Sequence, residues 1–155
     1  MNAHVFRARP VRAGLASALV LLVSACAGVP TRVTVLPSAA AAPSGVLAMD
    51  VTVTSRGRDC RGEPDACAIR AALEHVLFRG VPGSVQPTAM IADERAARQR
   101  HATYLDGLVR KDDGRQFVVS TTPVPRAPDT FTIALHHSRL RDALVREGII
   151  RRFGY

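Results

Sequence analysis

The amino-acid sequence predicts a small α+β domain, with a mainly antiparallel sheet of three to four strands and two or three helices packed on one face. Three segments have the pattern of strands, and three others carry apolar residues at helical spacing. The predicted order along the chain is β-α-α-β-β-α. One sheet covered by helices is the simplest way to bury the apolar faces of these elements together.

The first strand is predicted over residues 47–55, because apolar and polar residues alternate there. The residues on its inward face are Met49, Val51 and Val53. A polar loop separates this strand from a helix over residues 68–79. Gly80 follows that helix and suits the left-handed position at which many helices end.

A second helix is predicted over residues 92–110, where an apolar stripe recurs at helical spacing. The stripe consists of Ala97, His101, Tyr104, Leu105 and Leu108. A histidine in such a stripe is more often a satisfied core residue than a metal ligand. A loop rich in proline and glycine joins this helix to the first one.

The last part of the domain is predicted to be two strands and a helix. The strands cover residues 116–122 and 130–137, and a proline-containing loop over residues 123–129 joins them. The inward residues of the later strand are Phe131, Ile133 and Leu135. Ser138 suits the N-cap of a short third helix, and Gly148 follows that helix.

The first 25 residues have the pattern of a secretory signal peptide. Arg7, Arg9 and Arg12 form a basic start without any acidic residue, and an apolar stretch over residues 13–23 follows. A helix that spans a bilayer needs about 20 apolar residues, so this stretch is too short for one. We therefore expect residues 1–25 to be removed on export.

The four residues "VSAC" at positions 23–26 resemble the lipobox of bacterial lipoproteins, with an aliphatic residue, two small residues and a cysteine. The resemblance implies cleavage before Cys26 and acylation of its thiol. Two or three acyl chains anchor a protein durably, at about 0.8 kcal/mol per buried methylene. Ala27 rather than aspartate follows, which resembles the default sorting signal for the outer membrane, facing the periplasm, in a Gram-negative host. The alternative is an ordinary signal peptide with a chance cysteine.

The rest of the chain divides into a tether and one domain. Residues 26–45 comprise Cys26 and a flexible tether of small residues and prolines, and residues 46–155 form the single α+β domain. Residues 31–35, "TRVTV", offer an alternative within the tether, because they could pair as an edge strand.

The charge of the chain depends strongly on the leader. The full sequence has a formal net charge of +8, and after removal of the leader 18 basic residues face 13 acidic ones. Such a surface can favour anionic lipids or polymers, although an arginine-rich surface that is merely soluble is the simpler explanation. Nucleic acid is not expected as a partner, because the sequence lacks a row of exposed aromatic residues and carries an export signal.

Cys60 and Cys67 are expected to form a disulfide, because an exported chain reaches an oxidising compartment. Closing so small a loop stabilises a fold by about 2.5 kcal/mol in the chain-entropy model. Zinc binding is the rival, but two thiols give only half of a tetrahedral ligand set.

No set of residues in the sequence points to catalysis, a metal or a cofactor. His136 and His137 are adjacent in a predicted strand, so their side chains should point to opposite faces and cannot easily share a metal. Ser120 and Ser138 lack the partners of a catalytic triad, and no phosphate-binding or nucleophile-elbow motif occurs. We therefore expect a protein that is not an enzyme.

Two motifs are more specific than an ordinary surface requires: "LFRGVPGS" at residues 77–84 and "IIRRFGY" at residues 149–155. They allow an interaction surface formed by Arg79, Arg151, Arg152 and Tyr155. For the tail we favour a structural interpretation, in which its apolar residues close the core. These residues are Ile149, Ile150 and Phe153.

Together with the lipobox, the two motifs resemble small bacterial lipoproteins of unassigned function that carry an LFRG-x-PGS motif and a terminal I-R-[KR]-F-G-[FY] motif. The resemblance covers roughly residues 46–155 and implies an exported lipoprotein domain without implying any activity. We therefore expect an interaction or assembly module for an envelope protein, anchored in the membrane through the lipid on Cys26. The alternative is binding of an anionic envelope polymer or lipid by a basic surface.

Overall fold

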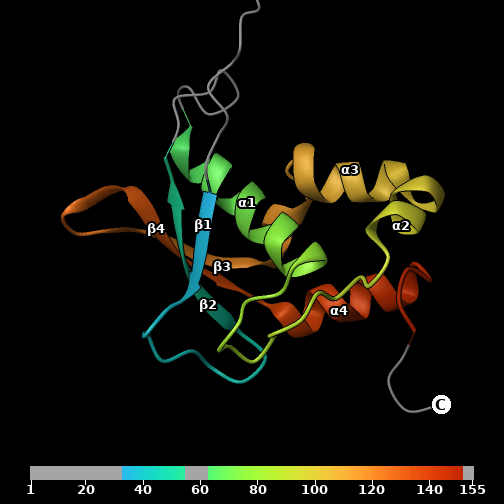
Figure 1. The fold of residues 1–155 in the computed structure, drawn as a ribbon, viewed down its shortest axis with the longest axis horizontal. Helices are drawn as coiled ribbons and strands as arrows, with labels where there is room; N and C mark the ends of the chain where they lie inside the picture. The colour runs from blue at the N-terminus through green and yellow to red at the C-terminus, as the bar shows by residue number, and fades with distance from the viewer. Residues whose placement is uncertain (1–32, 55–62, 152–155) are drawn as a thin grey trace, which may run out of the picture.

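The alternating pattern of residues 47–53 produces the central strand of an antiparallel sheet. The computed structural model describes residues 33–54 and 63–151 (Figure 1). The strands are β1 (Val33–Pro37), β2 (Leu47–Val53), β3 (Val118–Val124) and β4 (Ala127–Leu135). The helices are α1 (Pro64–Phe78), α2 (Glu94–Arg100), α3 (Ala102–Arg110) and α4 (His137–Arg146), with a short 3₁₀ helix, η2 (Asp113–Phe117), before β3. The predicted α+β class is confirmed.

The four strands lie in the order β1-β2-β4-β3, and every neighbouring pair is antiparallel. The register between β2 and β4 pairs Met49 with Ile133 and Val51 with Phe131. All four side chains are buried on the same face. The inward residues expected from the alternation in both strands are therefore confirmed, and β2 and β4 form the centre of the sheet.

Helix α1 covers the inner face of the sheet and contacts all four strands. It begins with Pro64 at its first turn, where the missing N–H of proline costs nothing. Its buried stripe includes Leu73, Val76 and Leu77, each at most 1% exposed. This stripe and the inward residues of β2 and β4 belong to one apolar core, which α3 and α4 complete with Leu105, Leu108, Leu140 and Leu144.

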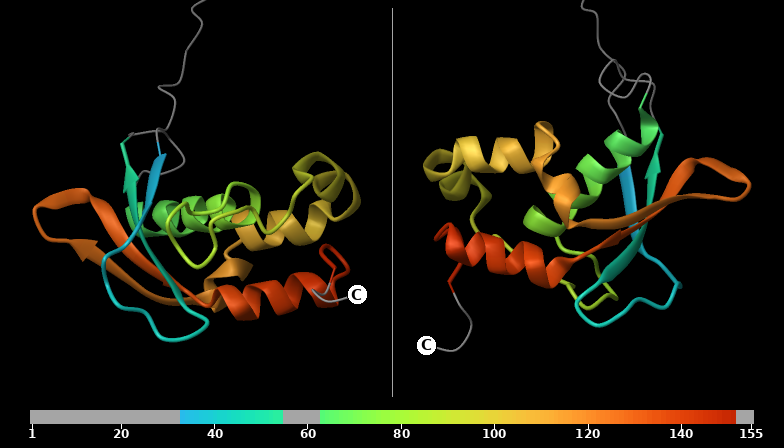
Figure 2. Two further views of the ribbon diagram at one scale, coloured as in Figure 1. Left: turned by 60° about the horizontal axis from the view of Figure 1, so that its bottom comes forward. Right: turned by 180° about the vertical axis from the view of Figure 1, so that it is seen from behind.

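The other helices lie beside the sheet rather than over it. Figures 1 and 2 show α2, α3 and α4 gathered at the end where β4 continues into α4. The expectation that all helices pack on one face therefore holds for α1, whereas α2–α4 extend the core sideways. This arrangement leaves the opposite face of the sheet without a helix among the described residues.

Two segments of the N-terminal half differ from the expectation. Residues 33–37, which fall within the expected tether, form β1 and pair with β2 from Val33 opposite Val53 to Pro37 opposite Met49. The edge-strand alternative for this segment is thus the observed one. Helix α1 also begins four residues before the expected residue 68.

The expected loop over residues 123–129 is mostly strand. β3 and β4 form a hairpin whose turn contains Pro125 and Arg126, and Arg126 adopts a left-handed backbone with φ of 65°. Pro123 fits in β3 because β3 is an edge strand, where a missing N–H need not break a ladder. The prolines therefore did not mark a loop here.

The expected helix over residues 92–110 is divided at His101 into α2 and α3. The break contains no proline or glycine, so we attribute it to tertiary packing, which overrides local propensity. α2 is attached to α1 through Arg98 and Glu74, whereas Leu105 and Leu108 of α3 enter the core.

The start of α4 also differs from the expectation. β4 ends at Leu135, His136 is the N-cap, and His137 is the first helical residue. The hydroxyl of Ser138, the expected N-cap, instead donates to the Gly45 carbonyl oxygen at 3.2 Å. Adjacent histidines at a helix start do not alternate as they would in a strand, so that expectation was wrong.

The motif "LFRGVPGS" forms the end of α1 and a tight turn after it. Gly80 has φ of +80°, as expected for a residue that follows a helix, and its N–H donates to the His75 carbonyl oxygen at 2.8 Å. The Ser84 hydroxyl donates to the Val81 carbonyl oxygen at 2.6 Å and accepts from the Gln86 N–H at 3.1 Å. The motif therefore has a structural explanation.

Candidate binding surfaces

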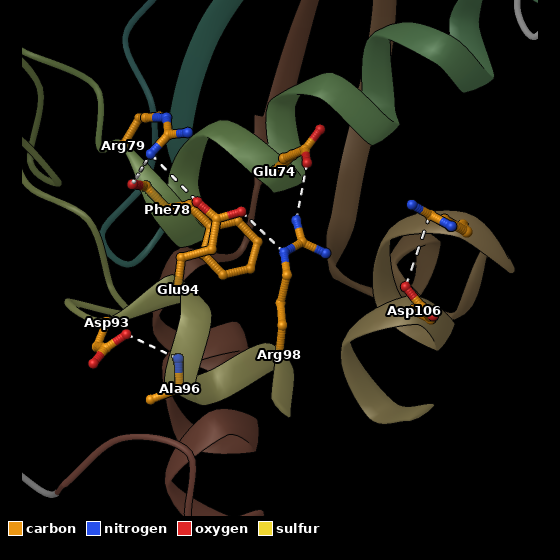
Figure 3. Close-up of polar contacts among 9 residues, drawn as sticks. Glu74, Phe78, Arg79, Asp93, Glu94, Ala96, Arg98 and Asp106 are labelled. Carbon is orange, nitrogen blue, oxygen red and sulfur yellow. Dashed lines mark hydrogen bonds and ion pairs between the residues drawn. The ribbon is translucent and has the colours of Figure 1, made fainter. Parts of the chain in front are cut away.

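Arg98 joins α2 to α1 through a compact set of charges (Figure 3). Its Nε donates to Glu94 at 2.9 Å and its Nη2 to Glu74 at 3.0 Å. The guanidinium carbon lies 4.5 Å from the centre of the Phe78 ring, a cation–π contact. The nearby Arg79 makes a 3.4 Å ion pair with Glu94. We interpret this cluster as a structural one that fixes α2 against the end of α1.

The four residues of the expected interaction surface do not form one described patch. The side chain of Arg79 is 66% exposed but is directed to Glu94 and to the Phe78 carbonyl oxygen. Arg151 is exposed and lines a different hollow, at the end of the described chain. Arg152 and Tyr155 lie outside the described residues. The expectation of a shared surface therefore stays a prediction.

The residues after α4 fold back onto the core. The Ile149 N–H donates to the Leu144 carbonyl oxygen at 2.9 Å, and Ile149 and Ile150 pack against the apolar core while partly buried. This agrees with the structural interpretation of the first half of the "IIRRFGY" motif. Phe153 lies outside the described residues.

A hollow of about 460 Å³, here called the C-terminal groove, lies where α2, α4 and residues 148–151 meet. Its apolar residues include Ile91, Ala97, Ile149 and Ile150, and its polar residues include Asp93, Arg100, His101, Arg141 and Arg151. The sequence did not indicate this site, because Arg100 and Arg141 lie in separate helices far apart along the chain. His101 is only partly buried and lines this groove, so it is not the core histidine that the apolar stripe suggested.

The outward side chains of the sheet form a second surface, here called the outer sheet face. It consists of Thr34, Leu36, Ala48, Asp50, Thr52, Ser120, Thr122, Thr130, Thr132 and Ala134. Hydroxyl groups on neighbouring strands contact one another across it, with Thr52 Oγ1 and Thr130 Oγ1 2.9 Å apart. Asp50 is the one ionisable residue of this set, and its carboxylate accepts from Thr132 at 2.7 Å.

The connection between β1 and β2 borders this face and creates a shallow groove of about 490 Å³. Its walls include Ala40 to Pro43 on one side and the prolines of β3 and its turn on the other. Leu36 is 58% exposed and Val119 is 52% exposed, which is unusual for large aliphatic side chains in a small domain. The surface is thus apolar and hydroxyl-rich, with almost no charge.

A third hollow, of about 490 Å³, contains His137 together with Gly45 and Ser84. Burial lowers the pKa of His137 from its usual value, and the neighbouring charge of Arg141 lowers it further, while the Gly45 carbonyl group opposes the shift. His137 is therefore expected to be neutral at physiological pH. The second histidine of the pair, His136, is the N-cap residue of α4 and is not among the residues that line this hollow.

Two other side chains have shifted pKa values. The pKa of His75 is lowered, chiefly by burial and then by Arg79, with Glu74 opposing. The pKa of Tyr104 is raised by burial and by Glu147, with Arg146 opposing. Neither lies in the C-terminal groove or on the outer sheet face, so both shifts reflect packing rather than a site.

Cys67 is buried at the start of α1 and is disulfide-bonded. Cys60, its expected partner, lies outside the described residues, as do Cys26 and the signal peptide. Over residues 33–54 and 63–151, no three histidine, cysteine or acidic side chains lie close enough to hold a metal ion. None of the helices in these ranges is long and apolar enough to cross a bilayer.

Comparisons with protein-family models, with curated proteins and with solved structures find no match for this chain.

Proposed function

We propose that this chain is a lipid-anchored protein of the cell envelope whose domain is a non-enzymatic docking module for a partner protein. The proposal takes acylated Cys26 as the anchor and residues 1–25 as the signal peptide. The resemblance of its motifs to small bacterial lipoproteins of unassigned function supports this placement and is part of the proposal.

The position of β1 brings the domain close to the proposed anchor. Because β1 begins at Val33, only residues 27–32 separate it from Cys26. Six residues span at most about 20 Å when fully extended. A lipid on Cys26 would therefore hold the start of β1 near the headgroups, where the domain can meet membrane proteins and their periplasmic parts.

The outer sheet face is the observation that carries the docking proposal. The outward side chains of β2 and β4 are only half-buried, and no described helix packs over them. Exposed Leu36 and Val119 would gain from burial, at about 25 cal/mol per Å² of apolar surface. A surface of this kind favours a partner with a neutral surface that is partly apolar.

The charge of this face distinguishes a protein from a polyanion as its partner. The set has no lysine or arginine, and its single carboxylate would repel an anionic polymer. The described residues as a whole carry 13 basic and 12 acidic side chains, so most of the basic excess lies elsewhere in the sequence. The charge of the described residues therefore supports a polyanion as the partner less well than the outer sheet face supports a protein.

The chemistry of the outer sheet face also favours binding over catalysis. Its hydroxyl groups bond to one another and to Asp50, and no histidine or cysteine belongs to the set of outward residues. A serine or threonine nucleophile is usually activated by a histidine or an amine, and the set contains neither, since Asp50 is its one ionisable residue. Docking is therefore the function that this face supports best.

Site-specific crosslinking in living cells tests the proposal. A photo-reactive amino acid at Ser120 should give a specific crosslinked protein in the envelope fraction. Adding Thr122→Arg should abolish that product, because an arginine would have to lose its hydration in the interface. The matched control is Gln99→Arg on the exposed side of α2, which should leave the product unchanged. An identical product in all three backgrounds would count against the outer sheet face.

A further inference from the structure

The shallow groove of about 490 Å³ on the outer sheet face, here called the outer groove, lies between residues 40–43 and the prolines of β3 and its turn. Among the described residues that line it, Asp50 is the only ionisable one, and Arg126, in the turn of the hairpin, is not part of the lining. None of these lining residues is next in the chain to a residue outside 33–54 and 63–151. The described residues thus give the outer groove a single negative charge.

The carboxylate of Asp50 is only partly used within the domain. Its Oδ1 accepts from the Thr132 hydroxyl at 2.7 Å. Within residues 33–54 and 63–151, no basic side chain forms an ion pair with Asp50, and its Oδ2 accepts no hydrogen bond. The side chain is half-buried, and Oδ2 is not among the buried polar atoms without a partner. One oxygen of a charged group is therefore left for a partner.

The surroundings of Asp50 limit how a partner can bind. The strand β2 is paired with β1 on one side and with β4 on the other, so the sheet already uses its backbone groups. A partner over this strand is therefore recognised through side chains and cannot add a strand to it. The register places Leu36 of β1 directly opposite Asp50, and Leu36 is 58% exposed. A side chain of the partner thus meets an aliphatic group and a carboxylate next to each other.

A partner that covers the outer groove has to supply a hydrogen-bond donor for Asp50. Docking removes water from the carboxylate, and a charge that has neither water nor a partner is costly to bury. A second copy of this chain, placed groove to groove, would bring a second Asp50 and no cation from the described lining. A lysine or an arginine meets both requirements, because its aliphatic stem can pack on Leu36 while its cationic head reaches Asp50.

We propose that the outer groove binds a segment of the partner protein that carries one lysine or arginine between apolar residues. The inference rests on the docking function proposed above and specifies the chemistry of the partner. The cationic head donates to Asp50 Oδ2, its stem lies on Leu36, and the flanking apolar residues cover Val119, which lines the groove and is 52% exposed. The pair of opposite charges leaves the contact neutral as a whole and selects the partner's register.

A photo-reactive amino acid at Ser120, combined with a change of Asp50, tests the proposal. Asp50→Asn removes the charge but keeps an oxygen that can accept from Thr132, so the fold should be retained. The yield of the crosslinked product in the envelope should fall by about tenfold, because a charge-assisted contact is lost. The matched control is Asp129→Asn, which removes an exposed carboxylate of β4 from outside the groove and should change the yield by less than about twofold.

The residue of the partner is tested by a double-mutant cycle. Mass spectrometry of the product locates the attached segment. We expect a lysine or arginine within about four residues of the attachment point, because Ser120 and Asp50 lie on one face, two strands apart. Changing that residue to glutamine should lower the yield by about tenfold. Adding Asp50→Asn should lower it no further, since both changes remove the same contact.

The outcomes separate this inference from the docking function. The absence of a product from Ser120 in every background would overturn both. A product that Asp50→Asn does not lower, or an attached segment without a basic residue, would overturn the inference and leave docking by the outer sheet face in place. Losses that multiply to about a hundredfold in the double variant would also overturn the pairing with Asp50. In the single variant of the partner this chain is unchanged, so a loss there cannot come from misfolding of the domain.

Discussion

Gly80 is the position where one added methyl group should have the largest effect on stability. Its φ of +80° lies in the left-handed region, which costs a residue other than glycine about 1–2 kcal/mol. A Cβ at this position would overlap the backbone of Thr88 and would lie 2.6 Å from the Pro87 carbonyl oxygen. Because these are backbone atoms, no side-chain rotation can relieve the overlap.

The segment that Gly80 contacts cannot easily move away. It is held on one side by the Val81 N–H, which donates to the Gln86 carbonyl oxygen at 2.8 Å. On the other side, the Ile91 N–H donates to the Leu77 carbonyl oxygen at 2.9 Å. Forcing extra volume into a well-packed site costs about 1–3 kcal/mol. We therefore expect Gly80→Ala to lower the free energy of unfolding by about 2–4 kcal/mol, a large part of the stability of a small domain.

Gly148 provides the matched control. It also has a positive φ, of 68°, but a Cβ there would meet nothing within 4 Å. Gly148→Ala should therefore cost only about 1 kcal/mol, since the unfolded chain also loses freedom. Urea unfolding followed by circular dichroism measures both variants. Equal losses would show that the contact between Gly80 and residues 87–88 does not constrain the fold as described.

The remaining predictions concern the tail, the cysteines and the pH. Deleting residues 149–155 should destabilise the domain by about 2 kcal/mol or more, because Ile149 and Ile150 pack on the core; normal urea unfolding of the deletion would contradict this. Replacing Cys60 and Cys67 by serine should lower the free energy of unfolding by about 2–3 kcal/mol, and free thiols at both positions in the exported protein would contradict the bridge. The pKa of His137 is lowered by folding from 6.5, so the unfolded state binds more protons and stability should fall as the pH drops through and below that value. Urea unfolding at about pH 7.5 and about pH 5 measures this, and a His137→Gln variant with the same pH dependence would refute it.

The parts of the fold that local patterns determine could be predicted from the sequence. The alternation in β2 and β4 identified Met49, Val51, Phe131, Ile133 and Leu135 as inward residues, because a half-buried strand imposes a period of two. The end of α1 at Gly80 was also predictable, because glycine readily adopts the left-handed conformation that follows many helices. Each of these features depends on residues close together in the chain.

The differences arose where tertiary position decides the outcome. Pro123 and Pro128 suggested a loop, but β3 is an edge strand, and Pro128 lies before Thr130, the first residue of β4 that pairs with β2. Neither proline therefore removes a hydrogen bond between β2 and β4. Only the order of the strands, which no local pattern reveals, makes these prolines compatible with the sheet.

The candidate sites were less predictable than the fold. The C-terminal groove unites Arg100 with Arg141, which neither spacing nor a motif connects, because the packing of α2 beside α4 creates it. The outer sheet face is open because α2–α4 lie beside the sheet and no helix of residues 33–54 and 63–151 covers it, a tertiary arrangement that no local pattern predicts. The sequence suggested that the "LFRGVPGS" motif belongs to an interaction surface, yet Gly80 and Ser84 explain it as a turn.

Acylation of Cys26 is the central claim, because the compartment, the short tether and the choice of an envelope partner all depend on it. Intact mass spectrometry of the protein purified from membranes tests this directly. We predict a chain that begins at Cys26 and carries two or three fatty acyl groups, and we predict that Cys26→Ser abolishes both the added mass and the membrane association. A mature chain that begins elsewhere, or an unmodified Cys26 thiol in membrane-bound protein, would contradict the account.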